Sequence, residues 1–359
     1  MAAVCLHPAV RSGWRAACRA GSLGPVRRRC SAPWYQEHLE VEEKGYRSPS
    51  RIREERFSIL KNPGVTTVEK LNKELLCDLL AQNVVYKEGP LVAINKPQGL
   101  PITGSPEGLS LVSVLPELQQ ILQMKSELHV VKASPKESSG LVLLSTCHVT
   151  TKEFEDFYAK CRKLERPFAT FCAITLGTPS PAKGEIKVAL KIENIGGLEL
   201  VVPVMHPSKG SLERREVKRT ETWYKVLHSV EGCSLLQLQP MSVHRDQLSV
   251  HCTLKFCPIL GDHTYSSRVS TILGENIYVP VDLAIPKTQR IDEKILRKMH
   301  ITEPQMHRIP LHLHFQHLLM PDSLSRRYPT HLTAPPPPFF KRTMELLHLK
   351  IKKPVLIEH

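Results

Sequence analysis

The sequence lacks several features that would place it in a familiar class. It has no run of about 18 apolar residues, so no segment predicts a transmembrane helix. Its ten cysteines include no C-x-x-C pair, which argues against a zinc ribbon or a thioredoxin-like site. The closest pair, Cys252 and Cys257, lies in an apolar stretch, and we expect both to be small core residues. This cysteine usage fits a reducing compartment.

Acidic side chains are absent from the first 36 residues, which contain six arginines among small residues. There is no long apolar core, so a secretory signal is a poor match. An arginine-rich, acid-free segment is typical of a mitochondrial presequence, because the membrane potential draws a positive helix inward. We therefore predict a presequence over 1–36, cleaved near 29–31, and a location in the mitochondrial matrix. The alternative is a basic tail that binds RNA directly.

The net charge of +14 favours a polyanionic partner, with RNA or DNA as the first candidate. Removing the presequence lowers the number of Lys and Arg from 49 to 43 and leaves Asp and Glu at 35, so the remaining charge is about +8. RNA binding must then depend on local sites.

Hydrophobic periodicity predicts a strand-rich chain with interspersed helices. Strands are predicted at 91–95, 140–145, 170–177, 185–192, 198–204, 221–228, 233–239 and 311–319. Helices are predicted at 66–82, with Thr67 as its cap, and at 151–163, 247–256 and 339–348. We expect a hairpin between 170–177 and 185–192, and loops over 205–220 and 267–308. The pattern indicates a mixed, largely antiparallel α+β domain.

Five local motifs follow one another between Leu91 and Met320. They are INKPQGLP (94–101), PKESSGLVLL (135–144), FCAITLG (171–177), SVHRDQLSVH with CPILGDHTY (242–265), and PLHLH (310–314). Each motif is weak alone, but the ordered set resembles the signatures of RluA-type RNA pseudouridine synthases. These are K-P-x-G, H-R-L-D-x-x-T-S-G-L, K-x-Y-x-A-x-x-x-G, H-Q-I-R-V-H with C-P-I-x-G-D-x-x-Y, and P-L-H-L-H. The pattern is most similar to mitochondrial members of that family.

The resemblance implies the catalytic-domain fold of that family, with flanking helices and a central RNA-binding cleft. It implies isomerisation of uridine to pseudouridine in mitochondrial mRNA or rRNA, in support of mitochondrial translation, without a cofactor or a metal. A flipped uridine would enter the cleft, where an aspartate acts as nucleophile, an aromatic ring stacks on the uracil and an arginine pairs with the aspartate. The implied organisation is a presequence (1–36), an N-terminal arm and helix (37–85) and a catalytic domain (86–350). No S4-type RNA-binding module precedes residue 85, so we expect protein partners in mitochondrial RNA processing.

Three positions depart from the family pattern. The aspartate position is Pro135, the arginine position is Ser249, and the stacking tyrosine is Phe171, which keeps the ring without the hydroxyl. Removing one member of a buried ion pair leaves the other charge uncompensated, so losing both charges together is the less costly change. Pro135 and Ser249 indicate that the ion pair was removed as a unit, and the mechanism of the family cannot run here as written.

Two carboxylates are candidate substitutes for the missing nucleophile, namely Glu137 and Asp246. The alternative roles are a solvated turn carboxylate for Glu137 and a helix N-terminal acid for Asp246. Asp262, which follows a glycine in a predicted turn, is expected to be structural.

Four further residues are candidate RNA contacts. Lys96 is a candidate for phosphate and Phe171 for base stacking, with a solvated lysine and a core phenylalanine as the alternatives. Gln247 and His251 are retained parts of the fourth motif. The histidines at 312, 314 and 317 are interpreted as strand residues and not as zinc ligands, because they lack an acidic or cysteine partner and do not share one strand face.

The sequence leaves two hypotheses open. The chain is either a mitochondrial pseudouridine synthase with a divergent active site, or a catalytically silent RNA-binding and assembly factor that keeps the cleft.

Overall fold

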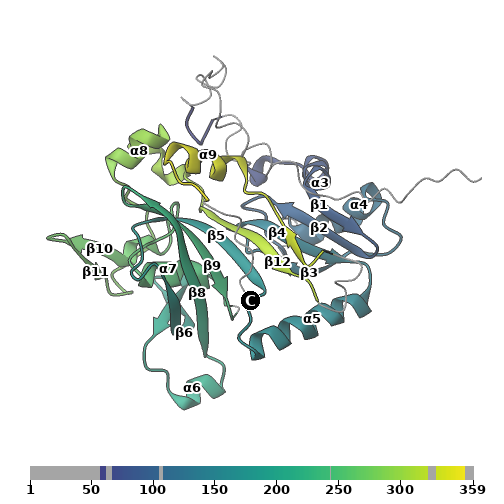
Figure 1. Cartoon of the computed structure of the whole chain (residues 1–359), viewed down its shortest axis with the longest axis horizontal. Coiled ribbons are helices and arrows are strands. Elements are labelled where there is room, and N and C mark those ends of the chain that lie inside the picture. Colours follow the sequence, from purple (N-terminus) through teal and green to yellow (C-terminus); the bar gives the residue numbers. More distant parts are fainter. Residues whose placement is uncertain (1–56, 62–66, 105–107, 243, 322–328, 352–359) are drawn as a thin grey trace, which may run out of the picture. The chain divides into compact units, whose positions relative to one another are not determined.

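The computed structural model describes residues 57–61, 67–104, 108–242, 244–321 and 329–351. Every element below belongs to this part of the chain (Figure 1). The predicted presequence and most of the predicted arm lie outside the described residues. The boundary predicted at residue 85 falls inside the first strand, β1 (Val84–Glu88), which pairs with the following strand of the main sheet.

An eleven-stranded sheet forms the centre of the described chain. Its strands follow the order β1, β2 (Leu91–Lys96), β4 (Ser139–Ser145), β12 (Leu313–Leu319), β5 (Ala169–Leu176), β9 (Cys233–Pro240), β8 (Val217–Val230), β6 (Lys183–Ile195) and β7 (Leu198–Val204). β3 (His129–Ala133) pairs with β4, and β13 (His331–Thr333) pairs with β12. The β4–β12 pair is parallel and the other pairs are antiparallel. The predicted mixed, largely antiparallel class is confirmed.

Helices flank this sheet along its length (Figure 1). They are α3 (Lys73–Gln82), α4 (Leu111–Ile121), α5 (His148–Lys163), α6 (Lys209–Glu213), α7 (Gln247–Leu254), α8 (Glu293–Met299) and α9 (Pro338–Leu346). Short 3-10 turns occur at Val68–Lys70, Ser266–Arg268 and Glu303–Arg308, and β10 (Val269–Ile272) forms a separate hairpin with β11 (Glu275–Tyr278). None of the helices in the described ranges has the length and apolar character needed to cross a membrane.

A close backbone approach joins the two halves of the sheet. β4 meets β12 at Gly140, which pairs with Phe315 and has φ +115°. A Cβ at residue 140 would lie 2.3 Å from the Phe315 carbonyl oxygen, so only glycine fits. The S-G-L step of the second motif is therefore needed for this junction.

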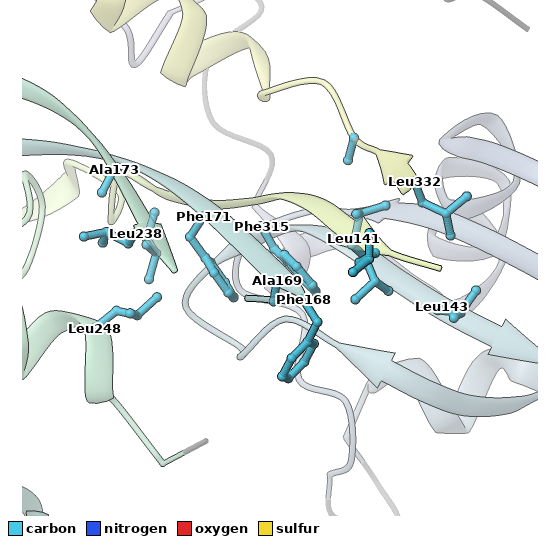
Figure 2. Packing of buried hydrophobic residues seen from close by; sticks show 14 of the residues in the cluster. Leu141, Leu143, Phe168, Ala169, Phe171, Ala173, Leu238, Leu248, Phe315 and Leu332 are labelled. Carbon is cyan, nitrogen blue, oxygen red and sulfur yellow. The ribbon is translucent and has the colours of Figure 1, made fainter. Parts of the chain in front are cut away.

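Apolar side chains from both halves pack together beside the junction. Figure 2 shows the rings of Phe171 and Phe315 next to each other, with Leu248 of α7 pointing toward the same group. Leu141 of β4 belongs to the same buried cluster, so β4, β5, β12 and α7 are held by one core. Burial of this apolar surface fixes the positions of the motifs relative to one another.

Several predicted elements need correction. β5 pairs with β9 and β12, and β6 pairs with β7 and β8, so the predicted hairpin between 170–177 and 185–192 is wrong. The helix predicted at 66–82 corresponds to α3, which begins at Lys73 and is capped by the Asn72 side chain, whereas Thr67 makes no side-chain cap. The predicted loop over 205–220 contains α6 and the start of β8, and the stretch over 267–308 contains β10, β11 and α8.

Candidate functional site

A small cavity of about 120 Å³ opens among β5, the β3–β4 turn and the start of α7. Its wall includes Pro135, Phe171 and Ser249, the three positions that depart from the family pattern. A larger hollow of about 860 Å³ shares Pro135 and Ser249 with it, as well as Glu137 and Asp246. The structure thus brings together residues that are up to about 110 positions apart in the sequence. We call Pro135, Phe171 and Ser249 the cavity wall.

The turn between β3 and β4 carries the first part of this wall. Ser138 closes the turn, because its backbone N–H and its hydroxyl both donate to the carbonyl of Pro135 at 3.2 Å. The N–H of Gly99 donates to the carbonyl of Lys136 at 2.9 Å, which ties the first motif to the second. Pro135 and Glu137 remain exposed on the turn.

The structure corrects the role predicted for Lys96. The side chain is buried, with 1% of its surface exposed, and is not placed to meet a phosphate in solvent. Its Nζ lies within hydrogen-bond distance of four carbonyl oxygens, which share its three N–H groups: those of Pro97 (3.1 Å), Leu100 (3.0 Å), Lys136 (3.3 Å) and Ser138 (2.9 Å). Burial lowers the pKa of Lys96 to about 7. Lys96 therefore links the two motif loops from inside, and neither the phosphate contact nor the solvated lysine describes it.

Phe171 is placed as an aromatic wall of the cavity. Its ring stacks on Phe315 with centroids 4.6 Å apart and an angle of 11° between the ring planes. The side chain is 8% exposed and lines the cavity. Phe315 fixes the orientation of the ring, and a fixed flat ring is a suitable surface for stacking a base.

The start of α7 carries Ser249 and is held by its neighbours in the fourth motif. The Gln247 amide donates to the Glu221 carbonyl and to the Thr222 hydroxyl, each at 2.9 Å. His251 is fully buried and hydrogen-bonded to the Thr220 hydroxyl at 2.9 Å.

Burial lowers the pKa of His251 to about 3, so the imidazole is neutral. His251 is enclosed by the protein, and the structure corrects its predicted contact with RNA. Gln247 also lines the cavity, but its side-chain amide is engaged with β8.

The two candidate carboxylates differ in how firmly they are held. Asp246 lies in the left-handed region with φ +50°, and its Oδ2 accepts a hydrogen bond from the Tyr265 hydroxyl at 2.7 Å. Arg245 lies 3.5 Å from the same carboxylate. The Glu137 side chain is 61% exposed and has a distant ion pair with Lys136 at 3.9 Å. Asp246 is therefore the better-positioned acid.

Asp262 has the structural contacts expected of it. Its Oδ1 accepts hydrogen bonds from the backbone N–H groups of Thr264 (3.0 Å) and Tyr265 (2.8 Å). Burial raises the pKa of Asp262 to about 6. These hydrogen bonds hold the turn that places the Tyr265 hydroxyl beside Asp246. Asp262 therefore supports the candidate acid indirectly, which the sequence alone did not predict.

The histidines of the last motif are hydrogen-bonded within the protein. His312 contacts the Pro310 carbonyl at 2.8 Å and the Thr343 hydroxyl at 2.7 Å, and His314 contacts the Ser139 hydroxyl at 2.9 Å and the Ala334 carbonyl at 3.0 Å. Burial lowers the pKa of both to about 4. Within the described ranges, no group of three His, Cys, Asp or Glu residues is placed to hold a metal ion.

Lys132 and Phe168 also line the cavity, and sequence reasoning gave neither of them a function. Lys132 occupies the histidine position of the H-R-L-D signature, so its place beside the turn was visible in the sequence. Phe168 precedes β5 by one residue, and nothing in the local pattern separates it from an ordinary core phenylalanine.

Comparison with known proteins agrees with the fold and the motifs. A family model described as RNA pseudouridylate synthase matches residues 90–254. The human protein named mitochondrial mRNA pseudouridine synthase RPUSD3 is 47% identical over 285 residues, which cover 79% of this chain and 81% of that protein. The chain belongs to the RluA-type RNA pseudouridylate synthase family, as the motifs predicted.

Relatives with lower sequence identity agree with this family assignment. The mouse protein named pseudouridylate synthase RPUSD4, mitochondrial, is 29% identical over 295 residues, covering 79% of this chain and 73% of that protein. The solved structure of human RNA pseudouridylate synthase domain containing 4 superposes with a TM-score of 0.61 at 26% identity, covering 78% of this chain and 98% of that one. The family fold thus extends well beyond the residues matched by the family model.

Proposed function

We propose that this chain acts in mitochondria on mRNA and isomerises uridine to pseudouridine in the cavity bounded by Pro135, Phe171 and Ser249. The observation that carries the proposal is the meeting of four of the five motifs, the second to the fifth, around one cavity of about 120 Å³, while the first motif lines the adjoining larger hollow. The human and mouse relatives named as mitochondrial mRNA pseudouridine synthases support the substrate and the compartment. A location in the matrix and protein partners in RNA processing are further parts of the proposal.

The reaction sets clear requirements on the cavity. The bond from C1′ of the ribose to N1 of uracil breaks, a bond from C1′ to C5 forms, and the C5 proton is removed while N1 gains one. The flipped base needs a surface to hold it while it turns, and Phe171 provides a fixed ring. A carboxylate is needed at the sugar or the base, and Pro135 cannot supply it.

Asp246 is the acid that we assign to this role. It lines the cavity, and the Tyr265 hydroxyl fixes its orientation. A positioned carboxylate is more effective than a mobile one, because the geometry is set before the substrate arrives. Glu137 is the second candidate and is weaker in this respect, since its side chain is 61% exposed.

A specific observation favours a second function, that of a catalytically silent RNA-binding factor. Pro135 and Ser249 lie on the same cavity, where the family pattern has an aspartate and an arginine. Removing a catalytic nucleophile costs on the order of 10⁴- to 10⁶-fold in rate. A chain with this substitution can keep its RNA cleft and assist assembly or processing without conversion.

One experiment separates these functions. Purified full-length protein is incubated with mitochondrial transcripts, and pseudouridine is mapped chemically, with RNA crosslinking measured on the same samples. Conversion by the wild-type chain, lost in Asp246→Asn and kept in Glu137→Gln, supports the proposal and the assigned acid. Crosslinking without conversion overturns the enzymatic proposal in favour of the silent factor. Asp246→Asn is a matched test, because the amide oxygen can still accept from Tyr265.

A further inference from the structure

Two cations from different elements converge on one aromatic ring beside the cavity. Lys132 of β3 places its ammonium 5.4 Å from the centroid of the Phe168 ring, and Arg162 of α5 places its guanidinium 5.9 Å from the same centroid. Phe168 is 1% exposed, so the ring is a fixed platform. Each cation is within the range of a cation–π contact.

No carboxylate neutralises this pair within the described part of the chain. Neither Lys132 nor Arg162 has a carboxylate within ion-pair distance there, although many other surface cations of the chain do. Burial, and then the charge of Arg162, lower the pKa of Lys132 to about 8. Two like charges held together without a counterion repel one another, and a bound anion offsets that cost.

The position of the pair indicates which anion it suits. Lys132 and Phe168 line the cavity together with Pro135 and Phe171, whereas Arg162 is exposed on α5. The cations therefore form a path from the cavity to the surface of the molecule. A nucleotide whose base lies against Phe171 must leave its backbone outside the cavity, and phosphates are the charged groups of that backbone.

We propose that Lys132 and Arg162 form a phosphate subsite that holds the RNA phosphodiester beside the flipped nucleotide. This subsite rests on the proposed function, because its ligand is the RNA that enters the cavity. The subsite supplies positive charge next to the cavity. Lys96 is buried and Ser249 is neutral, so neither of them can contact a phosphate as a cation. Contacts to phosphate carry no sequence information, so the subsite contributes to affinity and positioning and not to sequence choice.

The test is RNA binding by the full-length chain as a function of salt. Affinity for a fluorescein-labelled single-stranded RNA containing uridines is measured by anisotropy between low and moderate salt. Lys132→Gln and Arg162→Gln each remove one charge. Each is expected to weaken binding roughly tenfold and to lower the slope of log K against log salt by about 0.7. Lys132→Arg keeps the charge and is expected to keep the slope.

Lys125→Gln is the matched control, since it removes one exposed positive charge that does not line the cavity. Arg162 is exposed, so its substitution leaves the fold intact even if Lys132→Gln is destabilising. Wild-type slopes in both glutamine variants, or losses as large in Lys125→Gln, overturn the subsite while RNA binding by the wild-type chain still stands. A wild-type chain that binds no RNA overturns the proposed function together with the subsite.

Discussion

The same motifs supply two regions of the molecule that differ in how closely they follow the family. One is the cavity wall of Pro135, Phe171 and Ser249. The other, which we call the frame, consists of buried motif residues that hold loops and strands in place: Lys96, Gly140, Gln247, His251, Gly261, His312 and His314. Every frame residue matches the family signature, whereas every wall residue departs from it. The residues that hold the fold and those that line the proposed reaction site thus alternate within the same short segments.

The frame residues tolerate little substitution, because the surrounding backbone leaves little space for another side chain or depends on their hydrogen bonds. Gly140 leaves no space for a Cβ beside β12, and the Lys96 ammonium is surrounded by four carbonyl oxygens of the two motif loops. Pro135 and Ser249 of the wall line the cavity and do not belong to the apolar core cluster, whereas Phe171 also packs on Phe315. The family fold is therefore compatible with uncharged residues at these two positions, since this chain has the fold together with Pro135 and Ser249.

The largest expected effect is on a frame glycine. Gly261 has φ +84°, and a Cβ there would lie 2.0 Å from the Pro310 carbonyl oxygen. Gly261→Ala is expected to lower the free energy of unfolding by more than about 4 kcal/mol, as measured by denaturant unfolding. Gly274→Ala is the control, because Gly274 has φ +88° with nothing within 4 Å of its Cβ position. It is expected to cost only about 1–2 kcal/mol of backbone strain. Equal losses in both variants would contradict the packing role of Gly261.

The pH dependence of the free energy of unfolding provides a second test of the frame. Burial lowers the pKa of His314 to about 4, below the ordinary value of about 6.5. The unfolded chain therefore takes up a proton at a pH where the folded chain does not. The stabilisation is complete above about pH 6.5 and is lost as the pH falls toward 4, by up to about 3 kcal/mol.

His314→Gln isolates this contribution from the other titrating groups, which the variant retains. Its free energy of unfolding is expected to fall less than that of the wild type between pH 7 and pH 4.5. His307→Gln, which changes an exposed histidine on the Glu303–Arg308 turn, is the control and should follow the wild type. Parallel pH curves for the wild type and His314→Gln would show that the buried imidazole is not protonated on unfolding.

The contrast between frame and wall also explains what could be predicted from the sequence. The strands 91–95 and 233–239 and the helix 151–163 were evident from periodicity, and the motif order gave the family. Strand pairing was harder, because β5 finds β9 and β12 through contacts distant in sequence and not through the next strand along the chain. α4 contains Pro116 in its interior, which hid an otherwise clear pattern of three buried leucines and one buried valine.

Residue roles at the site were predicted with mixed success for a similar reason. Motif positions predicted that Pro135, Phe171 and Ser249 belong together, and the cavity contains all three. Local sequence does not show whether a polar side chain points inward, so Lys96 and His251 were assigned to RNA although both are buried. Convergence of Lys132 and Arg162 on Phe168 depends on how β3, α5 and β5 pack, and no local pattern reports it.

Substitutions of Phe171 test whether the cavity wall stacks a flipped base. Phe171→Leu is expected to weaken RNA binding by about 1–3 kcal/mol, because a flat stacking surface is lost, whereas Phe171→Tyr keeps the ring and the affinity. Phe154→Leu is the matched control, since Phe154 belongs to the same buried cluster but does not line the cavity. RNA affinity is measured by anisotropy at fixed salt, with thermal unfolding of each variant. A similar loss of affinity in Phe154→Leu would assign the effect to stability and not to stacking.

The smallest expected effect concerns positions 135 and 249, where the family pattern has an aspartate and an arginine. Pro135→Asp places a carboxyl on the exposed turn, where bound RNA would cover it and raise its pKa. Ser249→Arg adds the opposite charge from α7 across the same cavity, which keeps the carboxyl ionised. We expect the double variant to form pseudouridine roughly tenfold faster than Pro135→Asp alone, equivalent to about 1.4 kcal/mol of barrier. Ser249→Arg alone should show no gain, since it adds no nucleophile. If the single and double variants convert uridine at the same rate, the two positions are not coupled, and the wall changed one residue at a time and not as a pair.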